Sequence, residues 1–399
     1  MRINSIMRGI ITYVAVLSGA ISVSSCNDNL TPHQEPDPIE ITPSDITVSS
    51  VAGILSKLPI AQAQLEEVYD AVSSSSGNGY DEEYMMSDLF GSPGSGVGEP
   101  ITTRAGKART YDNPLRDMFT QYLRENMAST RGGDADVEAC VKAMTDSGMQ
   151  IYWPYSEDWD GKTYPIVTFD PGYGAESNYG YEITLDKSGA RVVSKVIVDE
   201  ETARERPVWV INTNDDSAYT PLDFFIKDSG RALAASEEPF AEGKTRLYIK
   251  NFTMLRNYDS WFGGASEFFI KCGAVDGFKA TDDNDLKLYT PKVTDFMIVV
   301  KRKQLGLTIP LDALVLTDLT DQMETLAFLI VEDDGGTTTN WKCEATVKYN
   351  SKSYGFDLNI PYKDKDDIVW RGQLNTSYFD RSKPVEGRFG DVKVSFQLR

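Results

Sequence analysis

The sequence predicts an α+β multidomain protein, with helices first, a central small β-rich domain next, and a C-terminal antiparallel β-sandwich. Three observations support this prediction. Apolar residues recur with the 3.6-residue period of a helix as far as Gly148, and with the two-residue period of a strand from Met149 onward. The third observation is length: roughly 350 residues follow the N-terminal signal and spacer, enough for two or three domains of ordinary size.

Residues 1–25 are predicted to be a lipoprotein signal peptide. Arg2 and Arg8 supply the positive charge, and 9–23 is uncharged and largely apolar but too short to span a bilayer comfortably. Val23-Ser24-Ser25-Cys26 resembles the bacterial lipobox. The resemblance implies a lipid anchor: diacylglycerol on the Cys26 sulfur and a palmitate-type chain on its amine. The alternative is an ordinary cleaved signal peptide with a cysteine near its end.

The residues after Cys26 suggest where the protein works. Asn27-Asp28-Asn29 resembles the export signal of surface lipoproteins in Bacteroidota, and the chain as a whole resembles an uncharacterised lipoprotein of that kind. This implies attachment to the outer membrane with the body exposed at the cell surface. Residues 26–43 form the predicted tether, which is semi-extended because it is rich in proline and acidic residues.

Residues 44–130 are predicted to be helical. Apolar stripes indicate helices over 48–58 and 61–72, with Glu66 and Glu67 turned to water, and an extension over 82–90. Residues 91–109 are rich in Gly, Ser and Pro, which predicts a flexible, protease-sensitive loop. Asn113 and Pro114 then open an amphipathic helix that ends near Met127.

Residues 131–240 are predicted to form an α+β domain. A helix from about Asp136 precedes five short strands, separated by Gly, Pro, Asn or Asp, over 150–155, 164–169, 179–185, 192–198 and 208–212. The polar stretch that follows, Asp215–Gly243, is the expected linker to the last domain.

Residues 244–399 are predicted to be the β-sandwich. Nine strands are expected and no long helical period interrupts them, which favours two packed antiparallel sheets. The expected strands are 246–254, 267–275, 295–301, 308–315, 326–331, 342–349, 354–360, 369–375 and 391–398.

Charge and histidine content exclude several functions. Without Arg2 and Arg8 the chain has 38 basic and 60 acidic residues, a net charge near −22 that disfavours nucleic acid and anionic lipid as partners. The single histidine, His33, lies in the tether. The body therefore lacks the residue needed for Ser-His-Asp, Cys-His and His-zinc chemistry.

Beyond Cys26 the cysteines are few and scattered: Cys140, Cys272 and Cys343. Cys272 and Cys343 are in phase with the inward residues of their strands. Buried free thiols are the favoured interpretation, and a Cys272–Cys343 disulfide is the alternative.

One acidic end of the sandwich is a candidate calcium site. Arg246–Ala274, with Asn257 and Asp259 in a loop, is similar to the opening of a C2-type domain, and Phe328–Gly335 is similar to the C2 strand that enters an acidic calcium loop. The resemblance implies weak calcium binding by Asp259, Glu332, Asp333 and Asp334; no other cofactor is expected. The adjacency of Asp333 and Asp334 departs from the C2 spacing, and solvated acidic turns are the alternative.

The densest aromatic stretch is a candidate glycan site. Trp159 follows a strand and is flanked by Glu157, Asp158 and Asp160, and rings beside carboxylates suit sugar faces and hydroxyls. Trp153 shares the inward face with Ile151, so Trp159 is the expected exposed ring.

Two functions remain open at this point. The first is a lipid-anchored, non-enzymatic binding or structural module with a glycan or protein ligand. The alternative is a histidine-free hydrolase of glycans that would use two facing carboxyl groups about 5–10 Å apart.

Overall fold

A computed structural model describes residues 46–91, 102–103, 106–107, 111, 113–127, 134–214, 219–225 and 243–399, all of which belong to one unit, Pro38–Arg399. The predicted signal peptide, the tether, most of the loop 91–109 and most of the linker 215–243 lie outside these residues.

The first two helices follow their sequence signals. Helix α1 (Val48–Lys57) begins at a capping box, in which Thr47 Oγ1 accepts from Ser50 N at 3.2 Å and Ser50 Oγ accepts from Thr47 N at 2.9 Å. It stops before Pro59, whose ring disfavours helical backbone at the preceding residue. Helix α2 (Gln62–Gly77) extends beyond its predicted end at residue 72.

The prediction that Glu67 faces water was wrong. Its side chain is buried, and its carboxylate accepts a hydrogen bond from Leu115 N at 2.7 Å. Leu115 is the first residue of α4 (Leu115–Met127), so Glu67 satisfies an N–H group that the helix itself leaves without a partner. Burial raises the pKa of Glu67, although this hydrogen bond acts to lower it.

Residues 82–90 are not one helix as predicted. Glu83–Met85 form strand β1, which pairs antiparallel with β4 (Met149–Tyr152), and only Met86–Leu89 are helical as α3. The partner strand lies about 65 residues later in the chain, and pairing with it outweighs local helix preference. Helix α5 (Asp134–Asp146) precedes β4, close to its prediction.

All five strands predicted for the central region are present in a six-stranded sheet of order β1-β4-β8-β5-β6-β7. Its pairs are antiparallel except for β5 with β8. The remaining elements are β5 (Ile166–Phe169), β6 (Ser177–Leu185), β7 (Arg191–Asp199), α6 (Glu200–Glu205) and β8 (Val208–Thr213). Helices α1, α2, α4 and α5 share one buried core with this sheet, so residues on both sides of the predicted boundary at 130 pack together. We call residues 46–214 the α+β part.

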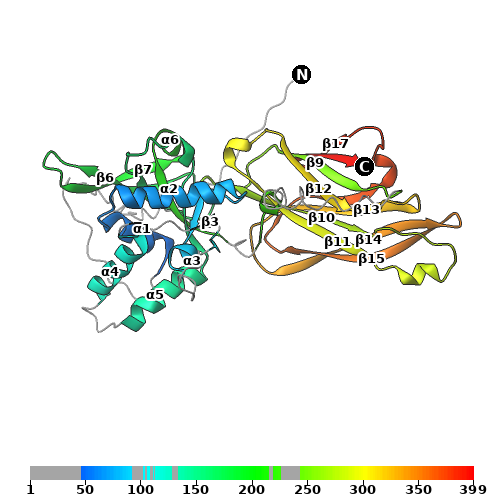
Figure 1. Cartoon of the computed structure of the whole chain (residues 1–399), viewed down its shortest axis with the longest axis horizontal. Helices are drawn as coiled ribbons and strands as arrows, with labels where there is room; N and C mark the ends of the chain where they lie inside the picture. The colour runs from blue at the N-terminus through cyan, green and yellow to red at the C-terminus, as the bar shows by residue number, and fades with distance from the viewer. Residues whose placement is uncertain are drawn as a thin grey trace, which may run out of the picture. The chain divides into compact units, whose positions relative to one another are not determined.

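The C-terminal residues form two antiparallel sheets, as predicted for a sandwich. One sheet has the order β11-β10-β13-β14-β15, with β16 also paired to β13, and the other has the order β12-β9-β18-β17 (Figure 1). The strands are β9 (Leu247–Met254), β10 (Ser266–Ala274), β11 (Lys292–Val300), β12 (Ile309–Leu316), β13 (Met323–Glu332), β14 (Thr338–Tyr349), β15 (Lys352–Lys363), β16 (Asp367–Asn375), β17 (Val385–Phe389) and β18 (Val392–Leu398). The predicted α+β fold class with a sandwich is confirmed.

Side chains from both sheets make one core. Phe252 of β9 packs on Phe268 of β10 at a ring separation of 5.0 Å, and Phe328 of β13 on Phe396 of β18 at 5.5 Å. Cys272 and Cys343 are free thiols; Cys272 is buried, as is Cys140, and Cys343 is half-buried. The favoured interpretation of free thiols is therefore correct, although Cys343 is less buried than expected.

Candidate functional site

The β9–β10 loop, residues 255–265, connects the sandwich to the α+β part. Its Trp261 and Phe262 are buried in a cluster with residues of the six-stranded sheet, among them Tyr152, Val208 and Val210. Trp261 Nε1 donates to Glu176 O at 3.0 Å. Asn212 Nδ2 donates to the carbonyls of Phe262 at 2.9 Å and Gly263 at 2.7 Å. The loop is thus held by apolar burial and by hydrogen bonds to its backbone. We call the region where the sandwich contacts the α+β part the junction.

A second set of junction contacts comes from three consecutive cations after β11, Lys301-Arg302-Lys303, which we call the basic triplet. Lys301 Nζ donates to Ser76 Oγ at the end of α2, and Lys303 pairs with Glu157 and, at 3.4 Å, with Glu82. Arg302 Nε lies 3.1 Å from the Glu200 carboxylate of α6. Each cation therefore contacts a different element of the α+β part. Sequence analysis missed the triplet, because a short basic run next to a strand usually indicates a solvated turn.

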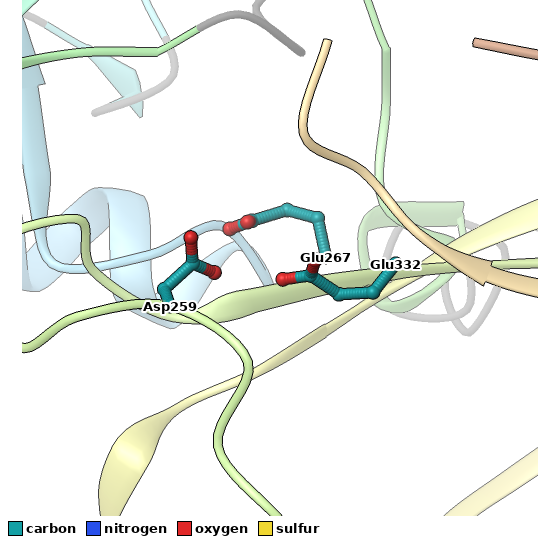
Figure 2. A group of neighbouring side chains, drawn as sticks. All are labelled: Asp259, Glu267 and Glu332. Atoms are coloured by element: carbon teal, nitrogen blue, oxygen red, sulfur yellow. The ribbon is translucent and has the colours of Figure 1, made fainter. Parts of the chain in front are cut away.

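Next to the junction lies an acidic cluster of three carboxylates, Asp259, Glu267 and Glu332. One oxygen of each lies within 4.8 Å of the others. Asp259 is in the β9–β10 loop, Glu267 is near the start of β10 and Glu332 ends β13, and these two strands are neighbours, with Phe268 opposite Glu332. Figure 2 shows the Glu267 and Glu332 side chains reaching toward Asp259, so that the three carboxylates converge. The strand register brings these groups together.

Glu332 is the most unusual member of the cluster. It is 0% exposed, and among the described residues neither of its carboxylate oxygens meets a hydrogen-bond donor. Burial, and then the neighbouring Asp259 carboxylate, raises the pKa of Glu332 to about 12. An isolated charge in such a place is strongly disfavoured, so the group requires a proton or a cation.

A small cavity of about 160 Å³ adjoins the cluster. Polar residues of both parts line it almost completely: Asp81, Glu83, Gln150, Asp170, Thr213, Asn214, Asp259, Gly263, Glu267, Asp333 and Asp334. Asp81 Oδ2 accepts from Ala265 N at 2.9 Å, while Asp81 Oδ1 and Gln150 Oε1 are buried without a donor in the described part of the chain. Burial raises the pKa of Asp81. The cavity therefore has a surplus of oxygen acceptors.

The structure brings together only part of the predicted calcium set. Asp259 and Glu332 meet, but Asp333 Oδ2 is 2.6 Å from Lys363 Nζ, an ion pair that already compensates its charge. Asp334 lines the cavity without belonging to the three-carboxylate cluster. Sequence analysis did not include Glu267, because it precedes the apolar Phe268 within a predicted strand and not in a turn. Only the pairing of β10 with β13 could have identified it.

The predicted glycan residues have partners within the protein. Trp159 is half-buried rather than exposed, its ring lies 5.2 Å from both Tyr69 and Trp153, and its Nε1 donates to Thr163 O at 2.9 Å. Trp153 is buried in the core, as expected. The ring predicted to stack on sugar is therefore packed against other aromatics, because the loop folds back onto α2.

The carboxylates beside Trp159 have structural roles as well. Asp160 accepts from Thr163 N at 2.7 Å and from Lys162 N at 3.0 Å, which closes a turn and lowers the Asp160 pKa. Glu157 pairs with Lys303 of the basic triplet; although burial opposes the shift, hydrogen bonds lower the pKa of Glu157 to about 2. Asp158 is exposed. These residues do not form an open aromatic strip with free acids.

Comparison with other proteins adds little. No family model matches the chain, and no curated protein matches it. A Drosophila chain described as C2-DSL-EGF1 is a structural match with 10% sequence identity and a TM-score of 0.16. The match covers 39% of this chain and 66% of that chain, slightly less than two thirds of its length. A TM-score this low carries no argument about fold or function.

In the described part of the chain no helix is both long enough and apolar enough to cross a membrane.

Proposed function

We propose that this protein is a lipid-anchored, non-enzymatic binding or structural module displayed at the outer membrane surface. The observation that carries the proposal is the sequence Val23-Ser24-Ser25-Cys26, followed by a proline-rich tether. Acyl chains contribute about 0.8 kcal/mol per buried CH₂ group, so several chains on Cys26 would hold the body permanently at the bilayer. The body would then need no membrane-binding surface of its own.

Two features of the described residues weigh against the alternative, a glycan hydrolase. The three clustered carboxylates include a fully buried one, and the cavity of about 160 Å³ beside them is smaller than the pockets of 300 Å³ or more that usually hold organic ligands. A larger hollow of about 540 Å³ between α4 and α5 has one acid in its lining, Glu138, and hydrolysis needs two. These hollows suit an ion or a bound partner better than sugar cleavage.

The anchor is tested by Cys26→Ser. We expect the variant to leave the membrane fraction or to remain unprocessed, because serine cannot carry the thioether-linked diacylglycerol. The measurement is fractionation of cells followed by a mass determination of the N-terminus. Cys343→Ser is the matched control, since it removes a half-buried free thiol far from the N-terminus and should fractionate like wild type. Unchanged membrane attachment and processing in Cys26→Ser would refute lipidation.

Surface display is tested with trypsin added to intact cells. If the body faces outward, we expect cleavage in the segment 104–109, where Arg104, Lys107 and Arg109 lie in the predicted loop. A periplasmic protein assayed in parallel should stay intact. Complete protection in intact cells, with cleavage after lysis, would place the body on the inner side.

A further inference from the structure

We propose that Asp259, Glu267 and Glu332 bind a divalent cation with the size and ligand preference of calcium. The inference concerns the folded body and is independent of the lipid anchor, so either proposal can fail without the other. It differs from the sequence-based expectation in its ligands: Glu267 enters the set, while Asp333 and Asp334 leave it.

The first argument is the buried carboxylate of Glu332. Three carboxylates have oxygens within 4.8 Å of one another, a distance at which like charges repel strongly away from bulk water. Glu332 is fully buried, and among the residues described neither of its oxygens has a hydrogen-bond donor, while the Asp259 carboxyl group lies next to it. Buried carboxylates normally have a donor or a counter-ion, so a cation bound beside Glu332 would compensate its charge.

The second argument is ligand type. All three candidates offer carboxylate oxygens. Neither histidine nor cysteine belongs to this cluster. Zinc and the softer transition metals prefer nitrogen or sulfur, whereas calcium takes six to eight oxygens in flexible geometry. Magnesium demands a near-ideal octahedron and retains several waters. A site whose carboxylates sit on a loop and two strand ends favours calcium.

The third argument is the source of the remaining ligands. Three carboxylates supply three to six oxygens, so calcium needs more from water or from neighbouring groups. The adjoining cavity of about 160 Å³ is large enough for several waters, and Asp81 and Gln150 add buried oxygens without donors to its wall. Carboxylates and carbonyl groups at the junction could therefore complete the shell.

The position of the site predicts its role. Its three main ligands belong to the sandwich, while Asp81 and Gln150, which line the same cavity, belong to the α+β part. Asp259 also lies in the loop that carries Trp261, and Arg302 donates to the Asp259 carbonyl at 2.9 Å. A bound ion would remove repulsion at this contact, so calcium should stabilise the junction.

The test is thermal unfolding of the purified full-length protein in detergent, stripped of metal with a chelator and titrated with calcium chloride. We expect a saturating rise in melting temperature with a midpoint at roughly 0.1–1 mM, the range of extracellular calcium modules. At a hundredfold excess over Kd the rise should be about 5 °C. Equilibrium dialysis with radioactive calcium should give one ion per chain that survives excess magnesium.

Glu332→Gln is the decisive variant, because it keeps size and polarity but removes one ligand charge. It should lose the calcium-induced shift and the ion detected by dialysis, and melt without calcium at or above the temperature of stripped wild type. Asp283→Asn, which removes one charge from an exposed acidic loop, should keep the full shift. Asp259→Asn replaces Glu332→Gln if the latter does not fold.

Two results would overturn the proposal. One is no shift in wild type at 10 mM calcium, which would mean that a proton held between Glu332 and Asp259 is the neutralising group. The other is an equal shift in wild type and in both cluster variants, which would mean that calcium acts only on the general acidic surface.

Discussion

Trp261→Ala should destabilise the protein by about 3–5 kcal/mol, the usual cost of removing a large buried aromatic side chain. Trp261 is 1% exposed, packs on Phe262 at a ring separation of 3.9 Å, and fills the contact between the β9–β10 loop and the six-stranded sheet. The substitution also removes the hydrogen bond to Glu176 O. Trp261 belongs to a third cluster of loop and sheet residues, apart from the cores of the sandwich and of the α+β part. The loss should therefore fall mainly on the contact between these two parts.

Differential scanning calorimetry checks this prediction. We expect the transition of the variant to split or broaden as the α+β part and the sandwich unfold more independently. Trp370→Ala is the matched control: Trp370 is half-buried within the sandwich, where it packs on Phe389, so its loss should lower stability without separating the transitions. A loss of unfolding free energy below about 1 kcal/mol, together with one sharp transition, would contradict the assigned role of Trp261.

Arg302→Gln should lower the free energy of unfolding by about 2–4 kcal/mol. The Arg302 side chain is 11% exposed and donates to Glu200 at 3.1 and 3.2 Å and to the Asp259 carbonyl at 2.9 Å. Its removal leaves a partly buried Glu200 with Arg204 and Tyr155 as the remaining partners. Breaking one side of a buried pair costs about 3–5 kcal/mol, and the 24% exposure of Glu200 reduces this figure.

Chemical denaturation at pH 7 measures this cost, with Arg381→Gln as the control. Arg381 forms its ion pair with Asp321 at an exposed position, where such pairs contribute at most about 1 kcal/mol. If the two substitutions lowered the free energy of unfolding equally, the ion pair of Arg302 would contribute no more than an exposed surface pair.

The Glu200–Arg302 pair also predicts a dependence on pH. Partial burial acts to raise the pKa of Glu200, but hydrogen bonds from Arg302, Arg204 and Tyr155 lower it from 4.5 to about 2. A carboxyl group whose pKa is lower in the folded state contributes stability above its unfolded pKa, and this contribution is lost as pH falls through the folded value. The stability difference between wild type and Glu200→Gln should therefore be full above pH 4.5 and shrink toward zero near pH 2. A difference that stays constant across this window would show that Glu200 does not titrate as described.

Periodicity predicted the elements of this fold well. The nine sandwich strands and the five central strands were predicted because each is a short run between turn signals, either alternating like Val392–Leu398 or continuously apolar like Leu326–Val331. β17 was missed because Val385-Glu386-Gly387-Arg388-Phe389 has apolar residues only at its ends, and its pairing with β18 makes it a strand. Strand Glu83–Met85 was not predicted for a related reason, since it exists only through its pairing with β4.

The candidate site was harder to predict, because it depends on which segments meet. Asp259 and Glu332 could be singled out as acids in turns at strand ends. Glu267 needed the register of β10 against β13. The partners of the basic triplet, from Ser76 to Glu200, lie about 100 to 225 residues away in sequence, and no local pattern encodes such distances. Local periodicity specifies elements, whereas tertiary contacts specify the site.

The central claim, that the three-carboxylate cluster is a cation site, is tested most directly by anomalous X-ray scattering from crystals of the protein grown with terbium or another lanthanide in place of calcium. The predicted result is one strong anomalous peak at about 2.3–2.6 Å from oxygens of Asp259, Glu267 and Glu332. Crystals in which this position is empty while lanthanide occupies exposed acidic turns would contradict the claim.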